Sequence, residues 1–206
     1  MKINKQSDST YTITNLVRSN KLKELLDLFN IDNANNGDNQ ITIKNVTSLK
    51  TLSEWESSQK HPLLDYLQAE ELFDNFAAIS LYLEKVGLQL STLDNDNIIV
   101  IDDGIFIPTN MNDLYEIKNN NITIDSPYNK KNPYLSLILQ NNDKIPFQVN
   151  YKCFYSSLAL LIYNKLLDKE NKNYLHGLRP IFGSRLYWML RYCLLENPEE
   201  RLIVII

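Results

Sequence analysis

The apolar residues of this chain repeat with two different periods, and these periods predict where its helices and strands lie. Apolar residues three and four positions apart are typical of a helix with one buried face, and alternation is typical of a half-buried strand. The predicted helices are residues 15–31, a short helix carrying Leu52 and Trp55, and residues 63–86, 149–167 and 182–195. The predicted strands are residues 10–14, 40–46, 98–102, 105–108 and 122–124, and residues 1–9 are expected to be disordered.

A polar loop followed by a hairpin is the most distinctive stretch of the chain. Ser91–Asn97 is polar, and the apolar runs Ile98–Asp102 and Ile105–Pro108 flank the dipeptide Asp103-Gly104. An Asp-Gly pair between two apolar runs is a strong signal for a tight β-hairpin. Gly87 is expected to end the long helix that precedes this loop.

Length and composition indicate a soluble globular chain. At 206 residues, with 44% hydrophobic and 22% charged residues, it can bury one core, and we expect a single domain over residues 1–206. A net charge of −4 gives no general attraction to nucleic acid or to an anionic membrane, so neither is expected as a partner. No apolar run approaches the roughly 18 residues of a membrane span.

The expected setting is the cytoplasm or the inside of a particle. The polar N-terminal residues contain no apolar segment typical of a secretory signal. Cys153 and Cys193 are therefore expected to be reduced and buried rather than bridged. Frequent Asn, Lys and Ile indicate an AT-rich coding sequence, such as that of a protist or a large DNA virus. For a viral protein the setting would be the host cytoplasm or the virion.

The order of these elements resembles that of a protein kinase with a shortened front end. The resemblance covers about residues 40–201 and implies an α+β, mainly helical fold. It implies a kinase-like large lobe over residues 49–206 and a reduced small lobe over residues 1–48. The matching segments are Gln40–Val46 (hinge strand), Ser48–Ser57 (short helix after it), Leu63–Val86 (helix before the catalytic loop), Asn97–Val100 (N-I-L-V), Tyr134–Leu139 (A-P-E), Ser157–Ala159 (S-x-G) and Leu186–Arg201 (L-x-x-D-P-x-x-R).

The catalytic residues of that family are missing. The resemblance places Thr92 where a kinase has its catalytic Asp, and a hydroxyl has no useful basicity near pH 7. The metal-binding D-F-G is absent, with no carboxylate until Asp113, and there is no glycine-rich phosphate loop. Leu137-Ile138 replaces the Pro-Glu whose Glu would pair with Arg201, so Arg201 needs another acceptor or an exposed position. We therefore expect a pseudokinase, not an enzyme.

An acidic cluster in the polar loop and hairpin turn has two interpretations. Asp94, Asp96 and Asn97 could supply oxygen ligands to a divalent metal or contact a nucleotide, and Asn97 matches a kinase metal ligand. Alternatively, Asp94, Asp96, Asn97, Asp102 and Asp103 form a solvated turn with local hydrogen bonds. No bound metal or cofactor is expected.

Aromatic and apolar residues near the C-terminus are candidates for an interface. Tyr187 and Trp188 belong to an aromatic stripe that either packs in the core or faces a partner, since interfaces favour these side chains. Ile203 and Ile205 belong to the terminal run Leu202–Ile206, which must bury on its own core, in a dimer or in a partner's groove.

These observations lead to one functional hypothesis and two alternatives. The chain is expected to be a catalytically inactive kinase-like protein that acts as a protein-binding scaffold or regulatory module, with a protein partner or a homodimer. The alternatives are a divergent phosphotransferase or nucleotide- or metal-binding protein, and a structural component of a viral particle.

Overall fold

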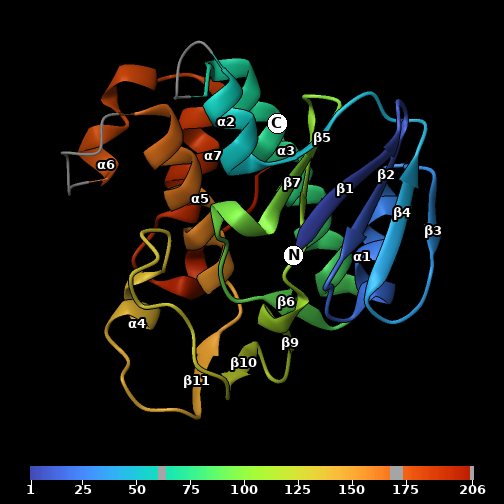
Figure 1. Cartoon of the computed structure of the whole chain (residues 1–206). Coiled ribbons are helices and arrows are strands. Elements are labelled where there is room, and N and C mark those ends of the chain that lie inside the picture. The colour runs from blue at the N-terminus through green and yellow to red at the C-terminus, as the bar shows by residue number, and fades with distance from the viewer. Residues whose placement is uncertain (60–63, 168–173, 205–206) are drawn as a thin grey trace. The chain divides into compact units, whose positions relative to one another are not determined.

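The computed structural model describes residues 1–59, 64–167 and 174–204 and divides the chain into two compact units (Figure 1). Unit 1 comprises Met1–Pro62 and Asp94–Leu114, and unit 2 comprises Leu63–Leu93 and Tyr115–Ile206. The expectation of a single domain over residues 1–206 stays a prediction.

Unit 1 contains a four-stranded antiparallel sheet with one helix packed against it. The sheet order is β1-β2-β4-β3, and β4 pairs with β2 so that Ile13 lies opposite Ile41. Alternate residues of β4 are buried, as are three consecutive residues of β2, and α1 packs against β3 and β4. The elements are β1 (Lys2–Ser7), β2 (Thr10–Thr14), α1 (Ser19–Leu28), β3 (Asn33–Asn35) and β4 (Gln40–Lys44).

The predicted hairpin is confirmed and forms most of a second sheet in unit 1. The strands β7 (Ile98–Ile101) and β8 (Ile105–Pro108) pair antiparallel, and β5 (Leu49–Thr51) flanks β7. Both Asp102 (φ 49°) and Asp103 (φ 60°) have the positive φ that a type I′ turn requires at its centre.

Helix α2 (Leu52–Ser58) covers this second sheet through a buried tryptophan. It begins with a capping box, in which Thr51 Oγ1 accepts from Glu54 N (3.2 Å) and Glu54 Oε2 accepts from Thr51 N (2.9 Å). The Trp55 ring meets Phe106 of β8 edge to face at 5.8 Å. Its Nε1 donates to Asp103 Oδ1 (2.8 Å), which ties the helix to the hairpin turn.

Three helices form the centre of unit 2: α3 (Tyr66–Lys85), α5 (Cys153–Leu166) and α7 (Arg185–Cys193). Residues 153–163 of α5 are all buried, which confirms the predicted helix at the centre of a core. Gly87, with φ +75°, follows the end of α3 as predicted. Cys153 and Cys193 are free and buried, as predicted.

Short elements surround these helices. The pair β10 and β11 packs its buried residues into a small cluster with Leu135, Leu139 and Cys153. The remaining short elements are β6 (Leu88–Leu90), η1 (Asn95–Asn97), η2 (Met111–Asp113), β9 (Leu114–Glu116), β10 (Asn121–Ile124), α4 (Leu137–Gln140), β11 (Phe147–Asn150), α6 (Tyr174–Gly177), η3 (Arg179–Ile181) and η4 (Pro198–Glu200).

The predicted fold class is wrong. The sequence analysis expected an α+β, mainly helical fold with a kinase-like large lobe and a reduced small lobe. The structure is a mixed fold with 41% helix and 23% strand, and its strands form several small antiparallel sheets. Most of the missed strands have three or four residues, such as β3, β5, β6 and β11, and so few residues give almost no alternating pattern. The sequence pattern therefore underestimated the strand content.

Two local predictions are also wrong. Residues 1–9 were expected to be disordered, but Lys2–Ser7 forms β1 by pairing with β2. This edge strand is polar and mostly exposed, and it is ordered mainly by its backbone pairing, which composition does not report. The first residues of the predicted helix 149–167 belong instead to β11, and α5 begins at Cys153.

Truncation of Phe76 tests the core of unit 2. Phe76 on α3 is fully buried, and its ring centroid lies 6.5 Å from that of Phe154 on α5. Phe76→Ala should therefore lower the free energy of unfolding by about 3–5 kcal/mol. Leu67→Ala, at a 68% exposed position of the same helix, should change it by less than about 0.5 kcal/mol. Urea unfolding followed by circular dichroism measures both, and equal effects would contradict this assignment of the core.

Candidate functional site

The predicted metal or cofactor residues lie in unit 1, where their polar atoms bond to the protein's own scaffold. Asp94 Oδ1 accepts from Asp96 N (3.3 Å) and caps η1, and Asp96 Oδ1 accepts from Ser53 Oγ (2.7 Å) of α2. The main-chain oxygen of Asn97 accepts from both the N (2.8 Å) and Oγ1 (3.1 Å) of Thr109. These contacts hold the loop against α2 and the end of β8.

The two carboxylates of the hairpin turn are also occupied. Asp102 Oδ1 accepts from Thr47 N (2.7 Å), Thr47 Oγ1 (2.7 Å) and Ser48 N (2.9 Å), while Asp103 accepts from Trp55 as described. Burial raises the pKa of Asp102, but the hydrogen bonds from Ser48 and Thr47 outweigh it and hold that pKa below its usual value. In the described part of the chain, no group of three or more His, Cys, Asp or Glu is placed to hold a metal ion.

Asn97 nevertheless lines a polar cavity of about 290 Å³ in unit 1. Four of the lining side chains are amides, which can both donate and accept hydrogen bonds, so the cavity suits a small uncharged polar ligand. No Lys, Arg, Asp or Glu is among its lining residues, which are Met1, Asn15, Leu16, Val17, Asn97, Thr109, Asn110 and Asn112.

A partly buried carboxyl group is hydrogen-bonded to one of the residues that line this cavity. Asn110 Nδ2 donates to Asp113 Oδ2 (2.7 Å). Burial, reinforced by the charge of Asp94, raises the pKa of Asp113 to about 6, against the opposing hydrogen bond from Asn110. Asp113 therefore titrates within the range of mildly acidic solutions.

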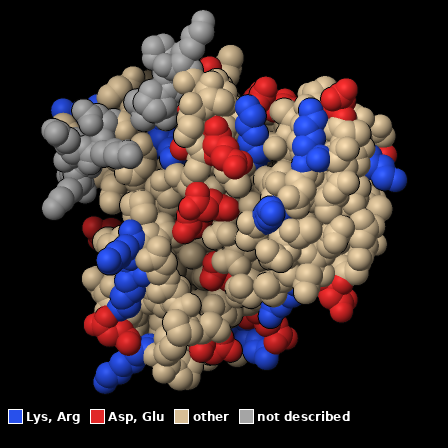
Figure 2. All heavy atoms as spheres, viewed as in Figure 1, with Lys and Arg blue, Asp and Glu red and all other residues tan. Residues whose placement is uncertain are grey.

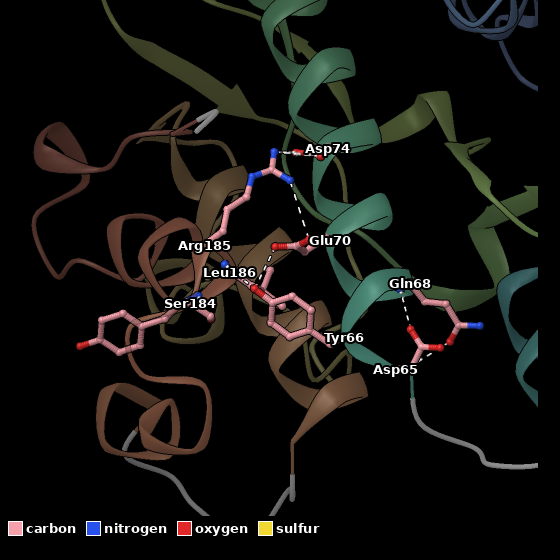
Figure 3. A network of polar contacts seen from close by, with 9 residues as sticks. Asp65, Tyr66, Gln68, Glu70, Asp74, Ser184, Arg185 and Leu186 are labelled. Atoms are coloured by element: carbon pink, nitrogen blue, oxygen red, sulfur yellow. Dashed lines mark hydrogen bonds and ion pairs between the residues drawn. The ribbon is translucent and has the colours of Figure 1, made fainter.

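A second candidate site lies on α7 of unit 2, where a salt bridge fixes the start of the helix (Figure 3). Arg185 Nη2 donates to both carboxylate oxygens of Asp74 on α3 (2.9 and 3.0 Å), and Arg185 Nη1 lies 3.9 Å from Glu70. Tyr66 Oη accepts from Leu186 N (3.2 Å) and donates to Glu70 Oε1 (2.8 Å). Two residues of α7 are thus bonded to three residues of α3.

The N-terminus of α7 is capped by its own sequence. Ser184 Oγ accepts from Tyr187 N (3.1 Å), and Gly183 before it has φ +81°. Gly183 supplies the left-handed backbone that turns the chain from η3 into α7. As a result, Phe182 lies outside the helix and does not follow its buried stripe.

Phe182, Tyr187, Trp188, Arg191 and Tyr192 form what we call the α7 aromatic surface. Tyr187 meets Phe182 and Trp188 edge to face, each at 5.0 Å, and Trp188 lies 6.5 Å from Tyr192. The Arg191 guanidinium carbon stands 5.5 Å from the Trp188 ring centre, and Arg191 Nη1 donates to Tyr187 Oη (3.4 Å). The five side chains therefore support one another.

The side chains of the α7 aromatic surface differ in their exposure to solvent. We call the buried part of the surface its backing and the exposed part its outer face. Tyr187 is only 9% exposed, whereas Phe182 is 70% and Tyr192 36% exposed, and Trp188 is half-buried. Of the predicted interface residues, Trp188 contributes to the outer face and Tyr187 to the backing. Ile203 is partly buried elsewhere in the unit, and Ile205 lies outside the described residues.

The sequence analysis missed Phe182 and Arg191 as site residues. Phe182 was assigned to the helix, where it would have counted as core. The Gly183-Ser184 pair, a turn residue followed by a helix cap, is the signal that could have placed it outside.

The sequence around this surface is basic, although the whole chain has a net charge of −4. Residues 174–195 contain Arg179, Arg185 and Arg191 and no Asp or Glu. Arg185 is neutralised by α3, whereas Arg179 and Arg191 are exposed. On the face shown in Figure 2, acidic and basic side chains are interspersed.

No model of a protein family matches the chain, and no curated protein matches it. Membership of a kinase-like family therefore stays a prediction. Among the helices of the described residues, none is both long enough and apolar enough to cross a membrane.

Replacement of Asp113 should change how stability depends on pH. The pKa of Asp113 in the folded state, about 6, lies above the ordinary value of 3.8, so the folded protein binds this proton more tightly. The free energy of unfolding should therefore fall as pH rises from about 4 to about 6. Asp113→Asn should match the wild type near pH 4 and be more stable by about 1–3 kcal/mol near pH 7.

Urea unfolding of both proteins across this pH range measures the difference. Asp38→Asn, at an exposed position of unit 1, is the control and should show no such pH-dependent difference. A difference between Asp113→Asn and wild type that is constant with pH would contradict the raised pKa.

Proposed function

We propose that this protein is a catalytically inactive binding module that recognises an acidic segment with apolar residues in a partner protein. The α7 aromatic surface is the proposed recognition site. The observation that carries the proposal is the exposure of Phe182, which is 70% exposed although its ring lies in contact with Tyr187. An isolated exposed apolar residue needs no explanation, but exposed aromatic rings in mutual contact are a feature of interaction sites.

The residue types of this surface support protein recognition. Tyr, Trp, Phe and Arg are enriched at interfaces, and Tyr, Trp and Arg are the commonest residues that dominate binding energy. Each aromatic ring can bury about 150–250 Å² of surface in a complex. Phe182, Trp188 and Tyr192 together therefore provide a compact apolar centre.

The surface is also held in place before any partner binds. The Arg185 salt bridge fixes α7 to α3, the Ser184 cap fixes its first turn, and Tyr187 supports the rings from behind. Fixed side chains lose less conformational entropy on binding, by about 0.5–1.5 kcal/mol for each side chain that is already immobile.

Charge indicates the kind of partner. Arg179 and Arg191 are exposed, and the segment from 174 to 195 carries no carboxylate that would repel an acidic partner. Complementary charge speeds association and disfavours basic partners. The expected partner segment therefore combines Asp or Glu with large apolar residues.

Nucleotide or metal binding is the second candidate, and the polar cavity beside Asn97 is the observation that favours it. Its residues include no Lys or Arg side chain for a phosphate and no carboxylate for a metal, so a small uncharged ligand suits it better. Thermal unfolding with and without ATP and Mg²⁺ distinguishes the candidates. A ligand at 100 times its dissociation constant would add about 2.7 kcal/mol of stability, whereas we expect no shift.

Selection from a random peptide library tests the proposed function. The wild-type protein is the target, and Phe182→Ala is used for counter-selection. We expect the enriched peptides to contain more Asp, Glu and large apolar residues than the starting library. Affinity measured for a selected peptide should fall at least about 10-fold in Phe182→Ala and in Trp188→Ala, as for residues at the centre of an interface.

Matched variants control this experiment. Leu67→Ala removes another exposed apolar side chain of unit 2 and should leave the affinity unchanged. Arg191→Glu reverses an exposed charge. It should lower the affinity for acidic peptides, and the loss should be largest at low ionic strength. Enrichment of neutral or basic peptides, or equal affinity for Phe182→Ala, would contradict the proposal.

A further inference from the structure

A second cavity, of about 300 Å³, lies in unit 2 and shares no lining residue with the α7 aromatic surface. It is formed by α4, α5, α6 and the segment that follows α7 (labelled in Figure 1). Its rim includes Leu137 and Ile138, which are 64% and 43% exposed. Its wall is mostly apolar and is lined by Leu137, Ile138, Leu160, Tyr174, Leu194 and Leu195.

The cavity also contains a buried cation. Arg201 is one of its lining residues and is only 8% exposed. Its guanidinium donates to the main-chain oxygens of Leu195 (2.7 Å), Glu196 (3.2 Å) and Lys152 (3.4 Å). The sequence analysis expected Arg201 to have either another acceptor or an exposed position, and the structure shows the first of these.

The charge of Arg201 is left without a counter-ion among the described residues, none of whose carboxylates lies within ion-pair distance. The three carbonyl oxygens accept hydrogen bonds from the guanidinium, but a carbonyl oxygen carries no full negative charge. A guanidinium has five N–H groups, so these three acceptors do not engage all of them. Burial raises the pKa of the nearby Cys153 and Cys193 thiols to about 12, so they are neutral near pH 7. A buried charge without a counter-ion is costly, and an anionic ligand would relieve that cost.

We propose that this cavity binds a medium-chain alkyl carboxylate, whose carboxylate pairs with Arg201 and whose chain lies along Leu137, Ile138 and Leu160. A guanidinium presents parallel N–H groups that match the two oxygens of a carboxylate. One water-sized group, such as a methylene, occupies roughly 30 Å³. The cavity volume of about 300 Å³ therefore accommodates a chain of about ten carbons.

The lining favours an alkyl chain over a peptide. A peptide brings main-chain N–H and C=O groups, and unpaired polar groups against Leu160, Leu194 and Leu195 would be costly. Of the other polar lining residues, Ser156 already donates its hydroxyl to the Cys193 oxygen (3.3 Å). Glu196 also lines the cavity, but it is exposed, so solvent and salt screen its charge.

Calorimetric titration of the full chain with decanoate, below its micelle concentration, tests this inference. Decanol, which has the same chain without a charge, is the matched ligand and should bind at least about 10-fold more weakly. Shortening the acid from decanoate to octanoate should weaken binding about 3- to 4-fold for each methylene removed.

Two variants locate the site. Arg201→Gln should weaken the binding of decanoate at least about 10-fold, because it removes the charge-assisted hydrogen bonds to the carboxylate. Because that variant could also lose its fold, Ile138→Glu places a carboxylate at the exposed rim instead and should abolish decanoate binding. Leu67→Glu makes the same change at another exposed position of unit 2 and should leave binding unchanged.

Several results would overturn the inference. No binding of decanoate would exclude the ligand class, and equal binding of decanol would exclude the role of Arg201. An equal loss of decanoate binding in Ile138→Glu and Leu67→Glu would show that decanoate does not bind in this cavity. Tighter binding of the tripeptide acetyl-Leu-Leu-Leu, with its free carboxylate, would identify a peptide terminus as the occupant instead.

Discussion

The burial of helix α5 on all sides is the constraint on which unit 2 depends. Its residues from Cys153 to Tyr163 are all shielded from solvent, so other elements must cover every face of it. Helices α3 and α7 both pack against it. Its few polar groups tie loops to it, since Ser157 Oγ accepts from Leu93 N (3.1 Å) and lies 3.1 Å from Thr92 Oγ1. Position 92, where the kinase resemblance would require a carboxylate, is thus a buried hydroxyl in a structural network.

Both proposed binding sites follow from how α5 is covered. Helix α7 turns its buried residues towards α5, which leaves Trp188 and Tyr192 on the other side, and Gly183 and Ser184 place Phe182 beside them. Ser156 and Leu160 of α5 form the inner wall of the apolar cavity. In unit 1, by contrast, the predicted acidic residues bind the local scaffold. The same residue types that suggest a metal site thus serve to hold a turn.

The sequence predicts the long elements and the hairpin well, because their signals are local. The hairpin turn at residues 102–104, the glycine after α3 and the apolar run of α5 each need only neighbouring residues to be recognised. The short strands were missed because their order comes from pairing with distant segments, as for β1 on β2. Phe182 was missed because one glycine decides whether it continues a helix. The Arg201 cavity was not predicted, since it depends on residues from four separate elements.

The most direct test of the proposed function is quenching of tryptophan fluorescence by acrylamide, with and without a bound acidic peptide. The chain has two tryptophans, and Trp55 is 1% exposed, so quenching by a solute in water reports on Trp188. If α7 is the recognition surface, saturation with peptide should reduce quenching of Trp188 to near that of a buried ring. Unchanged quenching with the peptide fully bound would show that recognition occurs elsewhere and would contradict the account.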